Sequence, residues 1–75
     1  MRLKITVHAQ ERIAERHIDV DHIKQVINSP DMKKPDLQGI KAIKKIGQKT
    51  LVVIYSKEGF RDRKDEFLII TAYYL

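Results

Sequence analysis

The sequence contains no cysteine, so the chain can form neither a disulfide framework nor a thiolate metal site. This absence fits a reducing cytoplasm. No apolar run approaches the roughly 20 residues that span a bilayer. The first ten residues lack the apolar centre and the small-residue cleavage site of a signal peptide. Together these absences predict a soluble, cytoplasmic protein with no membrane partner.

Positive charge is in excess, with 15 Lys and Arg residues against 10 Asp and Glu residues. The excess is local, because residues 31–49 contain six lysines and two aspartates, whereas residues 57–66 contain four basic and four acidic residues. A local basic patch favours an anionic partner, such as nucleic acid or an acidic protein tail. The alternative is a lysine-rich hairpin whose charge only keeps the protein soluble.

The first half of the chain predicts one strand and then helix. Residues 3–7 are rich in β-branched side chains, which favour a strand, and helix-forming residues follow. A second apolar repeat at helical spacing begins after Asp19, a favourable N-cap, and ends before Pro30. Residues 8–28 are therefore predicted to form two helices, or one helix broken near Ile18.

The second half predicts strands. Residues 31–39 are expected to be a loop, because Pro35 and Gly39 interrupt regular structure. Three strands should follow, joined by a turn after Gly47 and by a charged connection over residues 57–66. The predicted fold is α+β, with an N-terminal strand, two helices and a three-stranded antiparallel meander. Both helices should pack on one sheet face, and residues 1–75 should form a single domain.

Strict alternation along the last strand would place Leu68, Ile70, Ala72 and Tyr74 on one face, and Phe67, Ile69, Thr71 and Tyr73 on the other. The sheet face away from the helices should be partly open. It is expected to offer an anion a combination of basic and phenolic side chains, drawn from Lys41, Lys44, Lys45, Tyr55 and either Tyr73 or Tyr74.

The segment HAQERIAER places His8, Arg12 and Arg16 four residues apart, so on a helix they form one polar stripe. The stripe borders the apolar side of the helix, where arginine stems can cover the seam between helix and sheet. A guanidinium group matches two phosphate oxygens. The alternative is a solvated helix face on which Glu11 and Glu15 pair with the arginines.

His8 is a candidate proton acceptor, because a neutral histidine near physiological pH can take a proton. The alternative is a capping or merely exposed histidine. The spacing of His8, His17 and His22 does not suit a metal site, so no metal and no cofactor are predicted. Thr71 and Tyr73 should share a face, where their hydroxyl groups can bind phosphate or the phenol can stack on a base. Burial of the tyrosine in the core is the alternative.

The segments HAQERIAER, LVVIYS and IITAYY resemble a family of small bacterial and archaeal domains of unknown function related to the RelE/ParE toxins, within the barnase–colicin–RelE class of ribonuclease folds. The resemblance implies a metal-independent ribonuclease, often the toxin of a toxin–antitoxin pair. It implies two partners, RNA and an antitoxin protein. In RelE relatives the RNA is bound on the ribosome. By position His8, Arg12 and Arg16 match the family's basic motif, and Thr71 and Tyr73 match its closing strand. RelE itself has no dominant histidine, and ParE relatives target gyrase without cutting RNA.

The first hypothesis is therefore an RNA-cleaving toxin-like domain. His8 would act as general base or acid, the two arginines would stabilise the phosphate charge, and Tyr73 or Thr71 would orient the phosphate or help the leaving group. The RNA backbone would be followed, without reading of its sequence, by Lys41, Lys44 and Lys45. The second hypothesis is a non-enzymatic module that binds nucleic acid or an antitoxin-like partner with the same basic face. The third is a folded domain that has lost an ancestral activity.

Overall fold

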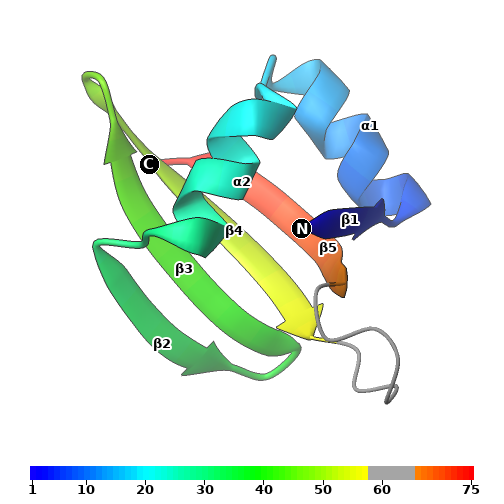
Figure 1. The fold of residues 1–75 in the computed structure, drawn as a ribbon. Coiled ribbons are helices and arrows are strands. Elements are labelled where there is room, and N and C mark those ends of the chain that lie inside the picture. Colours follow the sequence, from blue (N-terminus) through cyan, green and yellow to red (C-terminus); the bar gives the residue numbers. More distant parts are fainter. Residues whose placement is uncertain (58–65) are drawn as a thin grey trace.

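The computed structural model describes residues 1–57 and 66–75, and these form one sheet with two helices (Figure 1). In chain order the elements are β1 (Arg2–Ile5), α1 (Val7–Glu15), α2 (Val20–Asn28), β2 (Met32–Asp36), β3 (Gly39–Ile46), β4 (Lys49–Lys57) and β5 (Glu66–Tyr74). The strand order is β1-β5-β4-β3-β2, in which β1 lies parallel to β5 and the other pairs are antiparallel.

The predicted α+β class is confirmed, and the predicted three-stranded meander is wrong. Four strands, β2 to β5, form the antiparallel part, and β1 extends it as a fifth strand beside β5. The predicted charged connection over residues 57–66 lies outside the described residues, apart from its two end residues, which belong to β4 and β5.

The extra strand, β2, lies within residues 31–39, which the sequence predicts as a loop. Pro35 does not break β2. In the described sheet β2 is an edge strand, and proline is tolerated there because an N–H on the outer side of an edge strand does not pair with another strand. Gly39 begins β3 with a φ of 151°, and a side chain there would overlap the carbonyl oxygen of Tyr55 on β4. The two apparent breakers therefore mark an edge strand and a close approach of two strands.

The predicted break between two helices is confirmed. Helix α1 ends at Glu15, and His17 then adopts a left-handed φ of 52°, after which Ile18 is buried. Asp19 caps α2 as predicted, since its side chain accepts a hydrogen bond of 2.8 Å from the backbone N–H of Asp21.

The first strand ends at Ile5, two residues earlier than predicted. Thr6 is the N-cap of α1, and its hydroxyl oxygen accepts a hydrogen bond of 3.1 Å from the backbone N–H of Ala9. Val7 is thus the first residue of α1 and is exposed. His8 is the second residue of that helix.

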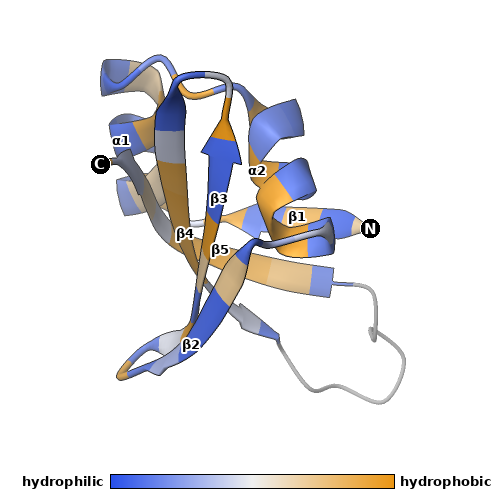
Figure 2. Ribbon diagram, turned by 90° about the vertical axis from the view of Figure 1, so that its left-hand side faces the viewer, coloured by the Kyte–Doolittle hydropathy of each residue, from blue (hydrophilic) through white to orange (hydrophobic). Residues whose placement is uncertain are grey.

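One hydrophobic core lies between the helices and one face of the sheet. Helix α2 lies over β3 and β4, and α1 lies alongside β5 (Figure 1). Hydropathy follows this arrangement, because the middle of β4 is hydrophobic whereas the edge strand β2 is mostly hydrophilic (Figure 2). The core includes Ala9 of α1, Ile23 and Val26 of α2, and Leu51, Val53 and Tyr55 of β4.

A β-bulge decides which face each side chain of β5 occupies. The register against β4 passes from Ile54 opposite Thr71 to Tyr55 opposite Ile69, so Ile70 is the extra residue. Strict alternation along this strand is therefore a wrong prediction, although Thr71 and Tyr73 still share a face. The residues that pack in or against the core are Phe67, Ile69, Ala72 and Tyr74.

Candidate nucleic-acid interface

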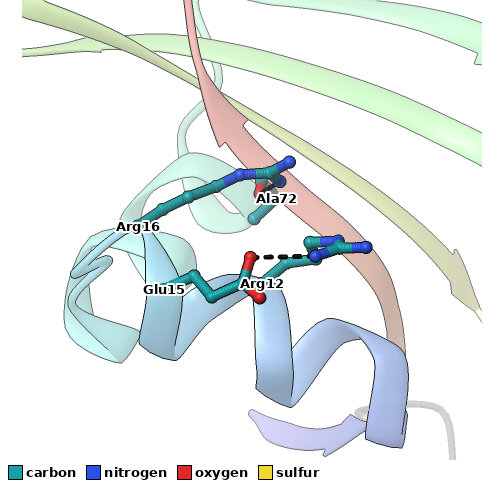
Figure 3. Close-up of polar contacts among 4 residues, drawn as sticks. All are labelled: Arg12, Glu15, Arg16 and Ala72. Atoms are coloured by element: carbon teal, nitrogen blue, oxygen red, sulfur yellow. Dashed lines mark hydrogen bonds and ion pairs between the residues drawn. The ribbon is translucent and has the colours of Figure 1, made fainter.

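The predicted stripe lies along α1 and its C-terminal cap. His8 is exposed, and its side chain has no hydrogen bond or ion pair within the described residues. Arg12 is partly exposed and donates a hydrogen bond from Nη1 to Oε2 of Glu15 at 2.8 Å (Figure 3). The alternative of a glutamate–arginine pair thus applies to Arg12 and Glu15. Arg12 keeps further N–H donors, because a guanidinium group has five.

Arg16 contacts β5 directly. Its Nη1 donates a hydrogen bond of 2.8 Å to the carbonyl oxygen of Ala72 (Figure 3). Strand β1 pairs with β5 only from Glu66 to Ile69, so Ala72 lies beyond the end of β1. Arg16 therefore satisfies a backbone acceptor on a part of β5 where β1 no longer covers the outer side.

Thr71 and Tyr73 lie on the opposite face of the sheet from the helices. We call this side, which neither helix covers, the uncovered face. Directly paired residues on neighbouring strands point to the same side of a sheet, so the registers define the rows of this face. One row consists of Met32, Ile43, Val52 and Tyr73, and the next of Lys34, Lys41, Ile54 and Thr71. None of these eight residues belongs to the helix-side core.

The three predicted lysines are divided between the two faces. Lys41 and Lys45 are four residues apart on β3, an even number, and lie on the uncovered face. Lys44 points to the helix side, where its Nζ donates to the carbonyl oxygen of Ser29 at 2.8 Å and lies 3.6 Å from Oδ1 of Asp31. Lys44 thus fastens the segment between α2 and β2.

Asp31 contacts both Lys44 and Lys45, which are adjacent residues of β3. Its Oδ2 accepts a hydrogen bond of 2.9 Å from the backbone N–H of Lys45. This hydrogen bond lowers the pKa of Asp31, desolvation opposes the shift, and the charge of Lys44 adds to the lowering. The side chain of Lys45 is not used in this contact and is exposed.

Sequence reasoning missed three cations on the uncovered face. Lys34 is paired directly with Lys41, which becomes visible only when β2 is recognised as a strand. Arg2 and Lys4 alternate on β1 with Leu3 and Ile5, which pack against the core. Their side chains therefore belong to the uncovered face, at the margin opposite to Lys34.

Two of the predicted tyrosines are on the helix side. Tyr55 is 2% exposed and packs edge-to-face against Phe67, with ring centroids 5.6 Å apart. Tyr74 packs against the core, and Nζ of Lys49 lies 5.1 Å from its ring centroid. Tyr73 is thus the tyrosine of the uncovered face.

A family model described as "Domain of unknown function (DUF4258)" matches residues 5–74. The chain belongs to the DUF4258 family. The match extends from the end of β1 to the end of β5. No curated protein and no solved structure matches the chain significantly. The family description names no activity, so the relation to the RelE and ParE toxins stays a prediction.

In this DUF4258 domain the stripe and the Thr71–Tyr73 pair do not face each other across one pocket. They lie on different sides of β5 and come nearest at Ala72, which stands between Thr71 and Tyr73 and accepts the hydrogen bond from Arg16. Two cavities, of about 310 and 380 Å³, lie at the β2–β3 hairpin, where Lys34 is one of the lining residues, and beside α2. Neither cavity is lined by Thr71 or Tyr73.

The described residues contain no group of three His, Cys, Asp or Glu side chains arranged to hold a metal ion. In the same residues neither helix has the length and hydropathy that crossing a membrane requires.

Proposed function

We propose that this DUF4258 domain binds RNA on the uncovered face of its sheet. The observation that supports this proposal most is the direct pairing of Lys34 with Lys41 across β2 and β3. Like charges opposite each other destabilise a sheet, and neither lysine has an acidic partner among the described residues. A bound phosphate would relieve the repulsion of the two lysines.

Further cations of the face suit the same ligand, and the face also has two carboxylates, those of Asp36 on β2 and of Glu66, which is paired with Arg2. Lys45 extends the lysines along β3, and Arg2 and Lys4 lie across the sheet on β1. Strands are about 4.8 Å apart, so β1 and β3 are separated by about 14 Å. Thr71 and Tyr73 on β5 lie between these basic margins. Cations arranged in this way can neutralise several phosphates without reading the base sequence.

Binding of a labelled generic single-stranded RNA, followed by fluorescence anisotropy over a series of salt concentrations, tests the proposal. The double variant Lys34→Gln/Lys41→Gln should bind more weakly, and its salt slope should fall by about 1.4, because each phosphate contact to a single strand contributes about 0.7. The matched control Lys24→Gln/Lys33→Gln removes the same charge from α2 and from the helix side of β2. It should stay close to the wild type.

Equal losses in the two double variants would overturn the proposal, because binding would then depend on net charge and not on this face. Absence of binding by the wild type at low salt would overturn it as well. The lysine repulsion gives a second readout. Without RNA, Lys41→Gln should be at least as stable as the wild type, since it removes one of the two opposed charges.

RNA cleavage is the second candidate function, and the position of His8 favours it. This exposed histidine has no partner among the described residues and lies in line with Arg12 and Arg16. In the proposed reaction the RNA 2′-oxygen attacks the adjacent phosphorus and the bond to the 5′-oxygen breaks, leaving a 2′,3′-cyclic phosphate. His8 would accept the proton of the 2′-hydroxyl or donate one to the leaving oxygen, and the arginines would stabilise the phosphate charge.

Incubation of generic RNA with the wild type and with His8→Ala, in the presence of a chelator, tests cleavage. We expect the variant to lose cleavage while its RNA affinity stays within a few-fold of the wild type. Cleavage that persists in His8→Ala would remove His8 from the mechanism, and an inactive wild type would leave binding alone. Growth arrest on expression that requires His8 would support the toxin hypothesis, with an antitoxin as the expected protein partner.

A further inference from the structure

The centre of the uncovered face is apolar, whereas its cations lie at the margins. The accessible apolar side chains of this face are those of Met32, which is 50% exposed, and of Ile43 and Tyr73, which are partly exposed, whereas Val52 between Ile43 and Tyr73 is fully buried. Val52 pairs with Tyr73 on one side and with Ile43 on the other, so the three side chains form a continuous row. A purely phosphate-binding surface would not need this apolar strip.

The apolar strip distinguishes between two forms of nucleic acid. A duplex presents phosphates and sugars and keeps the faces of its bases stacked inside, so it has nothing to pack on this strip. An unpaired strand exposes its base faces, which stack on aromatic side chains while the phosphates contact flanking cations. Tyr73 is partly exposed at the end of the row and supplies the aromatic ring.

We infer that the uncovered face selects unpaired nucleotides, and that a base stacks on Tyr73. This inference rests on the proposed RNA-binding function and adds the class of RNA. Among the described residues this face has one aromatic ring, that of Tyr73, so one base can stack on it while the neighbouring phosphates contact the lysines. The site would thus suit a short unpaired segment within a longer RNA.

The inference gives a prediction opposite to that of simple electrostatics. A duplex has the higher charge density, so attraction by lysines alone would favour the duplex over the single strand. We expect the wild type to bind an unpaired 12-nucleotide RNA at least about fivefold more tightly than a 12-base-pair RNA at the same salt concentration. Equal binding, or tighter binding of the duplex, would overturn the inference.

Substitution of Tyr73 tests the stacking itself. Tyr73→Leu should weaken binding of the unpaired RNA by between about fivefold and a hundredfold, the range of a lost base–aromatic stack, and should leave duplex binding within about twofold. Tyr73→Phe is the matched control, because it keeps the ring and removes only the hydroxyl group, and it should bind like the wild type. Equal losses in Tyr73→Phe and Tyr73→Leu would instead identify a hydrogen bond and overturn stacking.

Tyrosine fluorescence gives a second readout, which reports on the ring of Tyr73 directly. The chain has three tyrosines and no tryptophan, so its emission comes from tyrosine. Unpaired RNA should quench part of this emission in the wild type and not in Tyr73→Phe. Displacement of RNA by poly-glutamate as readily as by unlabelled RNA would indicate a general polyanion site and overturn the inference.

The two proposals fail in different ways. If the lysine variants weaken binding but the wild type does not distinguish unpaired from paired RNA, RNA binding stands and the inference is wrong. If no RNA binds, both are wrong.

Discussion

Strand β4 is buried on both of its sides, but the two sides are buried by different means. Leu51, Val53 and Tyr55 are covered by the helices and form part of the core. Val52 and Ile54 point to the face without helices and are nevertheless 0% and 9% exposed. The comparison teaches that low exposure alone does not identify the core between helices and sheet, because a sheet face that neither helix covers can have equally buried side chains at its centre.

Truncating one side chain on each face should give the largest difference in stability. Leu51→Ala on the helix side should lower the free energy of unfolding by about 2–5 kcal/mol, since the helices cannot fill the cavity completely. Ile43→Ala on the uncovered face should cost clearly less, because Ile43 is already partly exposed. Urea denaturation followed by circular dichroism measures both. Equal losses would mean that the uncovered face is a second core.

Arg16 lies where the two faces meet, at the outer side of β5. Arg16→Met keeps an apolar stem but leaves the carbonyl of Ala72 without its donor, which should cost about 1–3 kcal/mol of stability. Arg12→Met is the control, since the Arg12–Glu15 pair is exposed and such helix pairs contribute about 0.5 kcal/mol or less. Thermal unfolding compares the two variants. A larger loss in Arg12→Met would contradict the assignment of Arg16 to the edge of β5.

The smallest predicted effect concerns the pH dependence at Asp31. The pKa of Asp31 is lower in the folded state than in the unfolded chain, so its ionised form favours folding. That contribution is present above the unfolded pKa and is lost as the pH falls through the folded pKa. The urea midpoints of the wild type and Asp31→Asn should therefore differ at pH 7 and converge in acid. Lys45→Met should keep the wild-type pH dependence, because Asp31 accepts from the backbone of Lys45.

The features that the sequence predicted correctly depend on neighbours in the chain. The helix break and the Asp19 cap follow from local patterns, and the spacing of the stripe is fixed by the helical repeat. The missed features depend on distant partners. Pro35 predicts the end of regular structure unless its strand is known to lie at the edge of the sheet. The bulge at Ile70 leaves no mark in the apolar pattern of β5.

The candidate site shows the same limit. Lys34 joins Lys41 only through the register of β2 with β3, and Lys4 reaches this face only because β1 pairs with β5. Thr71 and Tyr73 share a face, as predicted, because both residues come after the bulge at Ile70. Lys44 does not lie on the uncovered face with Lys41 and Lys45. Side chains alternate along a strand, and Lys44 is an odd number of residues away from both other lysines.

The parallel pairing of β1 with β5 has a consequence for the order of folding during synthesis. Arg2 pairs with Glu66, 64 positions later (66 minus 2), whereas β2, β3 and β4 pair with their successors along the chain. Helix α1 packs mainly on β5, so its packing partner is missing until β5 has left the ribosome. The arginines of the α1 stripe and the tyrosine of β5 thus take up their native positions at the same late step.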